Sequence, residues 1–201
     1  RRFGASLEKI KQVADVRNGE IMFGLNMVVY KNKTIFVGDT SVHEYPTSEQ
    51  LADIAISTAR VVRLFGFDPK VAFVSHSTFG QPLTSRTKHI RKAVDILKEK
   101  KVDFEFDGDM QPDVALNSKY EELYPFSKIV GNANILIMPG QHSAAISYKM
   151  IKTLGDTKVI GPLLIGIGLP IEIAPLRSST SEIINLASIA AYSADIIDYN
   201  S

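Results

Sequence analysis

The chain has 201 residues, of which 45% are hydrophobic and 22% are charged, so its composition is that of a globular protein with a sizeable core. Its 23 basic and 22 acidic residues leave a net charge of +1, which gives no reason to expect nucleic acid or an anionic membrane as a partner. The absence of cysteine excludes a disulfide framework, a thiolate metal site and a cysteine nucleophile, and it fits a cytoplasmic location.

The first third of the chain predicts a helix, a hairpin and a second helix. Residues 1–13 have the pattern of an amphipathic helix rather than of a secretory signal. Two β-rich runs, 20–30 and 33–39, predict a hairpin. The following helix should begin after Thr47, because Gln50 completes a capping box with it, and should stop at Gly66.

From residue 70 onward, apolar strands alternate with amphipathic helices. Strands are expected at 70–77, 102–108, 134–140 and 157–166, and helices at 85–100 and 141–155. This alternation predicts an α/β fold with a mainly parallel sheet and helices on both faces. A last helix should follow the capping box formed by Ser179 and Glu182. Gly and Pro interrupt the long apolar run 159–176, so we expect no transmembrane segment.

Ligands of parallel α/β sheets bind at the carboxyl ends of the strands. Four segments should meet at that edge, namely 75–82, 107–113, 138–143 and 160–166. The hydroxyls of 75–80 precede a helix and could hold a phosphate there, although the segment lacks the P-loop pattern and a plain connecting loop is an equal alternative.

Acidic residues and histidines near this edge admit two interpretations each. Asp107, Asp109 and Asp113 lack EF-hand spacing, so a turn in which Asp107 bonds backbone amides is favoured over a metal site. His76 and His142 follow buried strands and could share a cleft, but no acid is placed beside them, so we expect structural or ligand-contacting roles rather than catalysis.

The order of "PTSEQLADIA", "FGFDPKVAFVSHST", "DGDMQPDVAL", "GNANILIMPG" and "VIGPLLIGIGLP" resembles the phosphotransacetylase (phosphate acetyl/butyryltransferase) family over nearly the whole chain. The segments "KVDFEFDGDMQPDVALN" and "HSAAISYKMIKTLG" are most similar to the phosphotransacetylase-like domain at the C-terminus of bacterial NADP-dependent malic enzymes. The resemblance implies a phosphotransacetylase or isocitrate-dehydrogenase-like fold and a fragment of a two-subdomain unit. It divides the chain into 1–46 (helix and hairpin at the subdomain junction), 47–170 (α/β subdomain) and 171–201 (strand and helix returning to the other subdomain).

The same resemblance implies a parent enzyme that converts malate to pyruvate with NADP and a divalent metal, Mg or Mn. The malic enzyme catalytic domain would be joined in cis, none of its catalytic residues would lie in this fragment, and the fragment itself would hold no cofactor. The domain would act as a homo-oligomer and bind acetyl-CoA or a related acyl-CoA as an allosteric effector.

Compared with the transferase pattern, the chain lacks the reactive groups. Where transferases carry two arginines, a serine and an aspartate, the resemblance places Gly168, Pro175, Leu176 and Ser181, so no catalytic residue is assigned. Arg177 could still hold a phosphate if the loop slips by one residue. The expected acyl-CoA or phosphate ligands are Ser75, Ser77, Thr78, His142 and Ser143, with Arg177 and Ser178 opposite them. The alternatives are an active phosphate acyltransferase and a pure assembly module that uses the 20–39 hairpin and the last helix as an interface.

Overall fold

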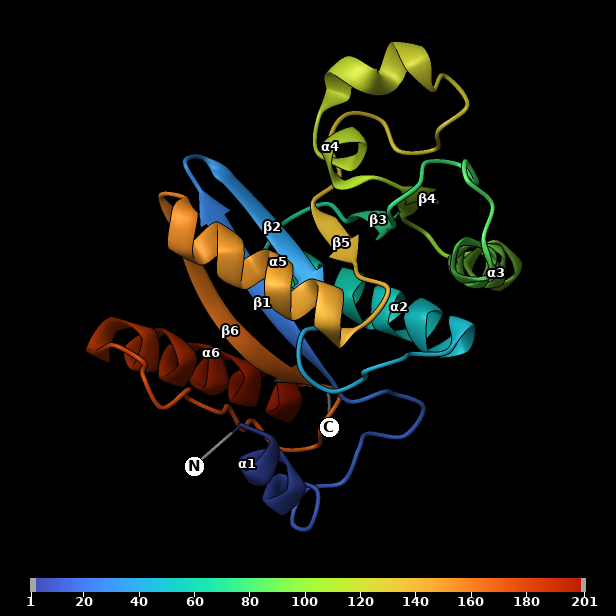
Figure 1. Cartoon of the computed structure of the whole chain (residues 1–201). Coiled ribbons are helices and arrows are strands. Elements are labelled where there is room, and N and C mark those ends of the chain that lie inside the picture. The colour runs from blue at the N-terminus through green and yellow to red at the C-terminus, as the bar shows by residue number, and fades with distance from the viewer. Residues whose placement is uncertain (1–2, 200–201) are drawn as a thin grey trace.

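The computed structural model describes residues 3–199, which form one six-stranded sheet in the order β4-β3-β5-β2-β1-β6 (Figure 1). The α/β fold expected from the sequence is confirmed. The strands are β1 (Phe23–Tyr30), β2 (Lys33–Gly38), β3 (Lys70–Val74), β4 (Glu105–Met110), β5 (Ile135–Ile137) and β6 (Thr157–Ile165). Within residues 3–199, five strands point the same way and β1 alone runs against them, because β1 pairs antiparallel with both β2 and β6.

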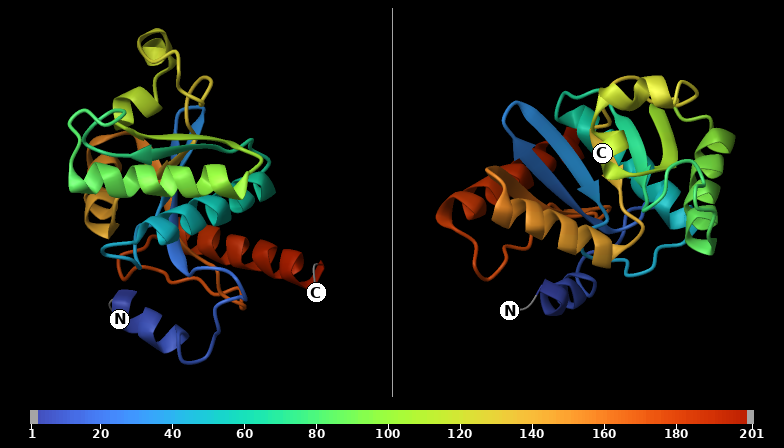
Figure 2. Two further views of the ribbon diagram at one scale, coloured as in Figure 1. Left: turned by 90° about the vertical axis from the view of Figure 1, so that its right-hand side faces the viewer. Right: turned by 45° about the horizontal axis from the view of Figure 1, so that its top comes forward.

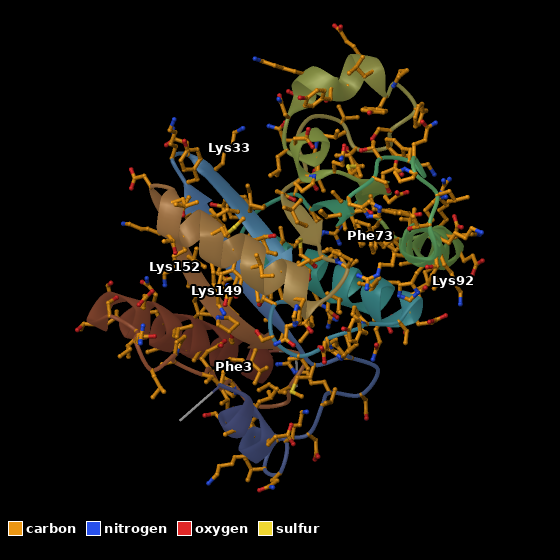
Figure 3. The ribbon with its side chains drawn as sticks, viewed as in Figure 1. Phe3, Lys33, Phe73, Lys92, Lys149 and Lys152 are labelled. Carbon is orange, nitrogen blue, oxygen red and sulfur yellow. The ribbon has the colours of Figure 1, made fainter. Side chains whose placement is uncertain are left out.

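Helices cover both faces of the sheet. They are α1 (Phe3–Ile10), α2 (Ser48–Leu64), α3 (Ser85–Lys100), α4 (Pro112–Ala115), the 3₁₀ helix η1 (Ser118–Leu123), α5 (Gln141–Leu154) and α6 (Thr180–Tyr199). One face packs against α2, α3 and part of α6, and the other packs against α5 and the α4 region. Figure 2 shows α2 and α3 side by side over the first face. Phe73 of β3 is fully buried in that layer, whereas Lys92 points outward from α3 (Figure 3).

Local sequence rules account for the helix starts. The Thr47 hydroxyl accepts the Gln50 N–H at 3.2 Å, and the Gln50 side chain accepts the Thr47 N–H at 2.8 Å. Ser179 and Glu182 form the same reciprocal pair before α6, at 3.3 and 2.7 Å. Each pair satisfies two backbone donors that a helix start leaves free. Both predicted capping boxes are therefore confirmed.

The structure corrects three details. β4 covers 105–110 rather than 102–108, so Asp107 and Asp109 lie in a strand and not in a turn. The hairpin strands β1 and β2 lie inside the sheet between β5 and β6, so neither has a free edge for pairing with a second copy; the assembly-module alternative itself stays a prediction. No strand follows β6 within residues 3–199; the expected strand in 171–201 is replaced by an irregular segment, 166–179, which contains two prolines. The division into 1–46, 47–170 and 171–201 stays a prediction.

Candidate functional site

The hydroxyls at the carboxyl end of β3 are buried and bonded within the protein. Ser77 donates to the Asp109 carboxylate, and the Thr78 hydroxyl accepts the Gln111 N–H at 3.2 Å. Ser75 Oγ lies 3.3 Å from Ser77 Oγ. Only 6, 1 and 8% of Ser75, Ser77 and Thr78 is exposed. These side chains hold the ends of β3 and β4 together, so a ligand could use them only by displacing those bonds.

Asp109 at the end of β4 organises this loop. Its side chain is fully buried and accepts the Ser77 hydroxyl and, at 3.3 Å, the Gly80 N–H. Its backbone oxygen accepts the Phe79 N–H at 2.7 Å. Carboxylate Oδ1 has no hydrogen-bond partner among the described residues. The sequence suggested Asp109 only as a weak metal candidate, whereas its structural role is to fix segment 77–80.

Asp107 bonds backbone amides, as predicted, although it does so from within β4. Its carboxylate accepts the N–H of Gly108 at 2.9 Å and of Lys128 at 2.8 Å. Residues 127–131 are thereby held against the edge strand. Across residues 3–199, no cluster of three or more His, Asp or Glu side chains could hold a metal ion.

The predicted ligands His142 and Ser143 lie at the start of α5, beside the loop that follows β2. Gln141 donates its N–H to the His43 carbonyl at 3.1 Å, which joins the two loops. Ser143 donates its hydroxyl to the Gly140 carbonyl at 2.8 Å, while His142 is exposed. His142 is thus available to a ligand, whereas the Ser143 proton is already used.

Asp39 is a site residue that the sequence analysis missed. Its buried carboxylate accepts the N–H groups of Gly24, Ser41, Val42 and His43 at 2.7 to 3.1 Å, and Oδ2 lies 2.7 Å from His43 Nδ1. An aspartate directly after a strand and before Thr and Ser is typical of turns in which the side chain binds following amides, and that pattern could have revealed it. Asp39 holds the loop after β2 in place.

Arg177 and Ser178 lie far from the strand-end hydroxyls. They line a pocket of about 110 Å³ together with Lys152 and residues 159–161 of β6. Three strands separate β6 from β3, which corresponds to roughly 19 Å at the usual strand spacing. The structure therefore brings Ser75, Ser77 and Thr78 together, but it does not bring Arg177 and Ser178 to the same cleft.

A carboxylate stands next to Ser181, the position expected to lack one. Glu182 binds Lys152 Nζ at 2.6 Å and accepts the Ser179 N–H at 2.7 Å. The ammonium group of Lys152, followed by the amide of Ser179, lowers the pKa of Glu182. The carboxylate is thus ionised and engaged in an ion pair and a helix cap.

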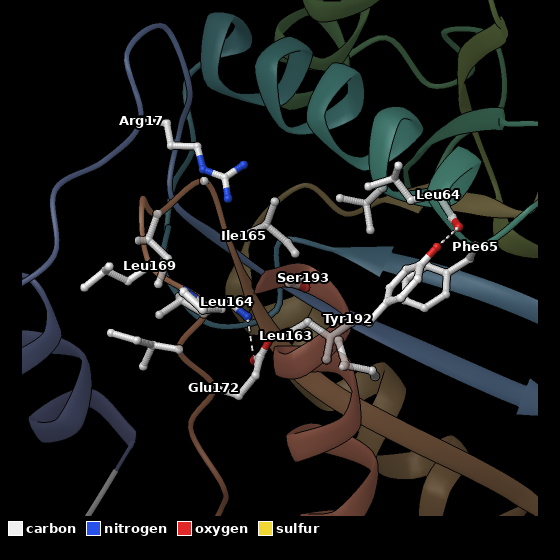
Figure 4. A pocket seen from close by; sticks show the side chains of 16 residues that line it. Arg17, Leu64, Phe65, Leu163, Leu164, Ile165, Leu169, Glu172, Tyr192 and Ser193 are labelled. Carbon is white, nitrogen blue, oxygen red and sulfur yellow. Dashed lines mark hydrogen bonds between the residues drawn. The ribbon is translucent and has the colours of Figure 1, made fainter. Parts of the chain in front are cut away.

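A second, mostly apolar pocket of about 100 Å³ lies between the end of α2, the end of β6 and α6 (Figure 4). Glu172 projects into it and accepts the Leu164 N–H at 2.9 Å. Burial raises the pKa of Glu172 to about 8. Gly166 bends the chain at the rim of this pocket. Its φ is +85°, and an added Cβ would lie 2.1 Å from the Ile21 carbonyl oxygen, so only glycine fits.

Comparisons with known proteins agree with this fold. The family model described as phosphate acetyl/butaryl transferase matches residues 2–191. An NADP-dependent malic enzyme of Rhizobium meliloti is 44% identical over 96% of this chain and 26% of its own length. A phosphate acetyltransferase of Clostridium acetobutylicum is 36% identical over 80% of this chain and 49% of its own length. The crystal structure of a phosphotransacetylase from Streptococcus pyogenes superposes with a TM-score of 0.90 at 28% identity, over 96% of this chain and 60% of that one.

The chain spans about a quarter of the length of the malic enzymes that it matches. None of the helices within residues 3–199 has both the length and the apolar character needed to cross a membrane. The match of the family model over residues 2–191 places this chain in the phosphate acetyl/butaryl transferase family.

Proposed function

We propose that this chain is the phosphotransacetylase-like regulatory and oligomerising domain of an NADP-dependent malic enzyme, that it binds acetyl-CoA as an allosteric effector, and that it does not itself transfer acyl groups. The observation that carries the proposal is the 44% identity to such an enzyme over nearly the whole of this chain. The parent would oxidise and decarboxylate malate to pyruvate with NADP and Mg or Mn, through a catalytic domain joined in cis. A cytoplasmic location and a homo-oligomer remain predictions.

The side chains support an inactive site. Acyl transfer from acetyl phosphate needs cations for the phosphate, donors for the oxyanion and a base for the thiol. The side chains of Pro175 and Leu176 offer neither a cation nor a donor, and Glu182 already serves an ion pair and a cap. Loss of a general base alone costs about 10² to 10⁴ in rate.

A site that no longer turns over its ligand can still act as an effector site, because regulation requires only that the ligand binds one conformation more tightly than another. His142 at the start of α5 and Arg177 beside α6 are exposed and polar, so both are free to contact an acyl-CoA.

The complete enzyme tests this proposal. Malate oxidation should respond to acetyl-CoA, and Arg177→Gln should shift the half-maximal acetyl-CoA concentration upward by about tenfold, since one charge-assisted contact is lost. Arg86→Gln, an exposed arginine of α3, is the matched control and should leave the response unchanged. Malate oxidation that ignores acetyl-CoA at every concentration would contradict the regulatory role.

An active phosphate acyltransferase is the second candidate, and the 36% identity to a phosphate acetyltransferase favours it. Mixing the complete protein with acetyl phosphate and CoA and following thioester formation separates the two. Sustained turnover that is lost in Glu182→Gln would establish the transferase and assign its base.

A further inference from the structure

A third pocket lies at the outer edge of β4, where Phe79 of the strand-end loop forms part of its wall, and no function has been assigned to it. It has a volume of about 320 Å³ and lies between α3, edge strand β4 and residues 126–128. This volume is in the range of sites for small molecules. We name it the β4-edge pocket.

Two cationic side chains in the β4-edge pocket are free to bind an anion. None of the ion pairs formed within residues 3–199 involves Arg91 or Lys128. By contrast, Lys98 in the same pocket is neutralised by Asp95 at 2.7 Å. A guanidinium and an ammonium group that share a pocket and are not engaged in ion pairs are suited to binding a phosphate, although the carboxylates of Asp95 and Asp107 line the same pocket.

The backbone keeps Arg91 in position. Its Nη1 makes a long contact, 3.5 Å, with the Phe79 carbonyl oxygen. Gly80 has a φ of +82°, and an added Cβ would lie 2.4 Å from Arg91 Nη1, so the guanidinium occupies space that only glycine leaves open. Most of the guanidinium donors remain unused, because a guanidinium carries five N–H groups.

The same pocket has an aromatic wall. The rings of Phe79 and Phe126 meet edge to face with centroids 4.8 Å apart, and Phe126 is 63% exposed. Phe79 has a φ of +51°, an uncommon backbone conformation for a bulky residue. An exposed ring face beside two cations is what a flat base attached to a phosphate requires.

Asp107 limits where the charge of a ligand can lie. Its carboxylate forms part of the pocket and would repel a phosphate placed against it. The phosphate must therefore contact Arg91 and Lys128, and the neutral part of the ligand must lie along Phe126. A bare inorganic anion would leave the aromatic wall unused, and a nucleic acid strand would find no strongly basic surface on a chain of net charge +1.

We infer that the β4-edge pocket binds a nucleoside phosphate, with its phosphates on Arg91 and Lys128 and its base against Phe126. None of the seven residues expected to contact acyl-CoA lines the β4-edge pocket, although Phe79, which does, directly follows Thr78.

ADP is the probe, titrated into the complete protein without NADP. A dinucleotide site elsewhere in a longer chain would bind ADP equally in all variants, so the result is the difference in ADP affinity between wild type and the variants of this pocket. Arg91→Gln and Phe126→Ala should each weaken ADP binding at least tenfold, and inorganic phosphate should bind at least tenfold more weakly than ADP. Lys92→Gln is the matched control, because Lys92 is on the same helix and pairs with Glu49 outside the pocket.

Absence of ADP binding, or equal ADP affinity in wild type, Arg91→Gln and Phe126→Ala, would overturn the inference. Equal affinity for ADP and phosphate would overturn the role of the aromatic wall. Thermal unfolding of each variant checks that it folds, and Lys128→Gln, a change to an exposed side chain, replaces any variant that does not.

Discussion

The strand-end loop 75–80 and the loop 166–179 differ in how their polar side chains are used. In the first loop, the hydroxyls of Ser77 and Thr78 are buried and bonded to β4 and to the residue after it. In the second, Arg177 is exposed and lies at a pocket rim. The first loop is therefore part of the framework, and the second retains groups with which a ligand could interact. The polar sequence of a loop does not distinguish these cases; the partners of its side chains do.

Among the substitutions compared at a single pH, the largest loss of stability should come at Asp109, which holds the strand-end loop. Asp109→Ala should lower the free energy of unfolding by about 3 kcal/mol, because a buried hydroxyl and a buried N–H lose their acceptor. Urea denaturation measures this. Asp109→Asn, which keeps one acceptor oxygen, should cost less. A loss of less than 1 kcal/mol in the free energy of unfolding of the alanine variant would mean that the Asp109 side chain does not hold the strand-end loop in place.

Glu172 is the buried carboxylate of the second loop, and its pKa of about 8 lies above the ordinary value of 4.5. Between these values the folded protein keeps a proton that the unfolded chain releases. The free energy of unfolding should therefore fall as pH rises through this window, by at most about 1.4 kcal/mol per pH unit. Glu172→Gln retains an acceptor for the Leu164 N–H and should flatten the slope. A slope that is the same in wild type and Glu172→Gln would show that the Glu172 carboxyl is solvated in the folded protein and that burial does not raise its pKa.

Ser77→Ala should cost about 1 kcal/mol, the usual net value of one buried hydrogen bond, because the Asp109 carboxylate keeps the Gly80 N–H. The same denaturation curves report it. A double-mutant cycle with Asp109→Ala should show strong coupling, since the two side chains share one bond. Additive effects would argue against the Ser77 to Asp109 bond.

Ser178→Ala should change the free energy of unfolding by less than about 0.5 kcal/mol, since substitutions at irregular surface positions without a buried partner rarely do more. A loss comparable to that of Ser77→Ala would show that the two loops are built alike, and the contrast between them would then fail.

Much of the fold could be predicted from the sequence because its determinants are local. The capping boxes at Thr47 and Ser179 and the alternation of apolar strands and helices fixed the element types and most boundaries. The predicted bounds of β4 were wrong because Asp107 and Asp109 are residue types common in turns. Acidic residues are accommodated inside this strand because β4 pairs with β3 and the Asp107 carboxylate accepts a backbone N–H.

The candidate site was only partly predictable, because it depends on which distant residues meet. The sequence indicated that hydroxyls follow β3. It did not indicate that the hydroxyls of Ser77 and Thr78 are hydrogen-bonded to Asp109 and Gln111. Arg177 was expected opposite Ser75, yet strand order separates them by three strands, and strand order is not a local property. The sequence comparison considered Ser181 and not the neighbouring Glu182. The structure shows that the Glu182 carboxylate pairs with Lys152 and caps the start of α6.

The most direct test of a binding domain without turnover is one titration followed by one assay on the same sample of the complete protein. Calorimetry with acetyl-CoA should show saturable binding at one site per chain, and acetyl phosphate with CoA should then yield no thioester above the blank. Absence of binding heat at any acetyl-CoA concentration, or steady thioester production, would contradict the account.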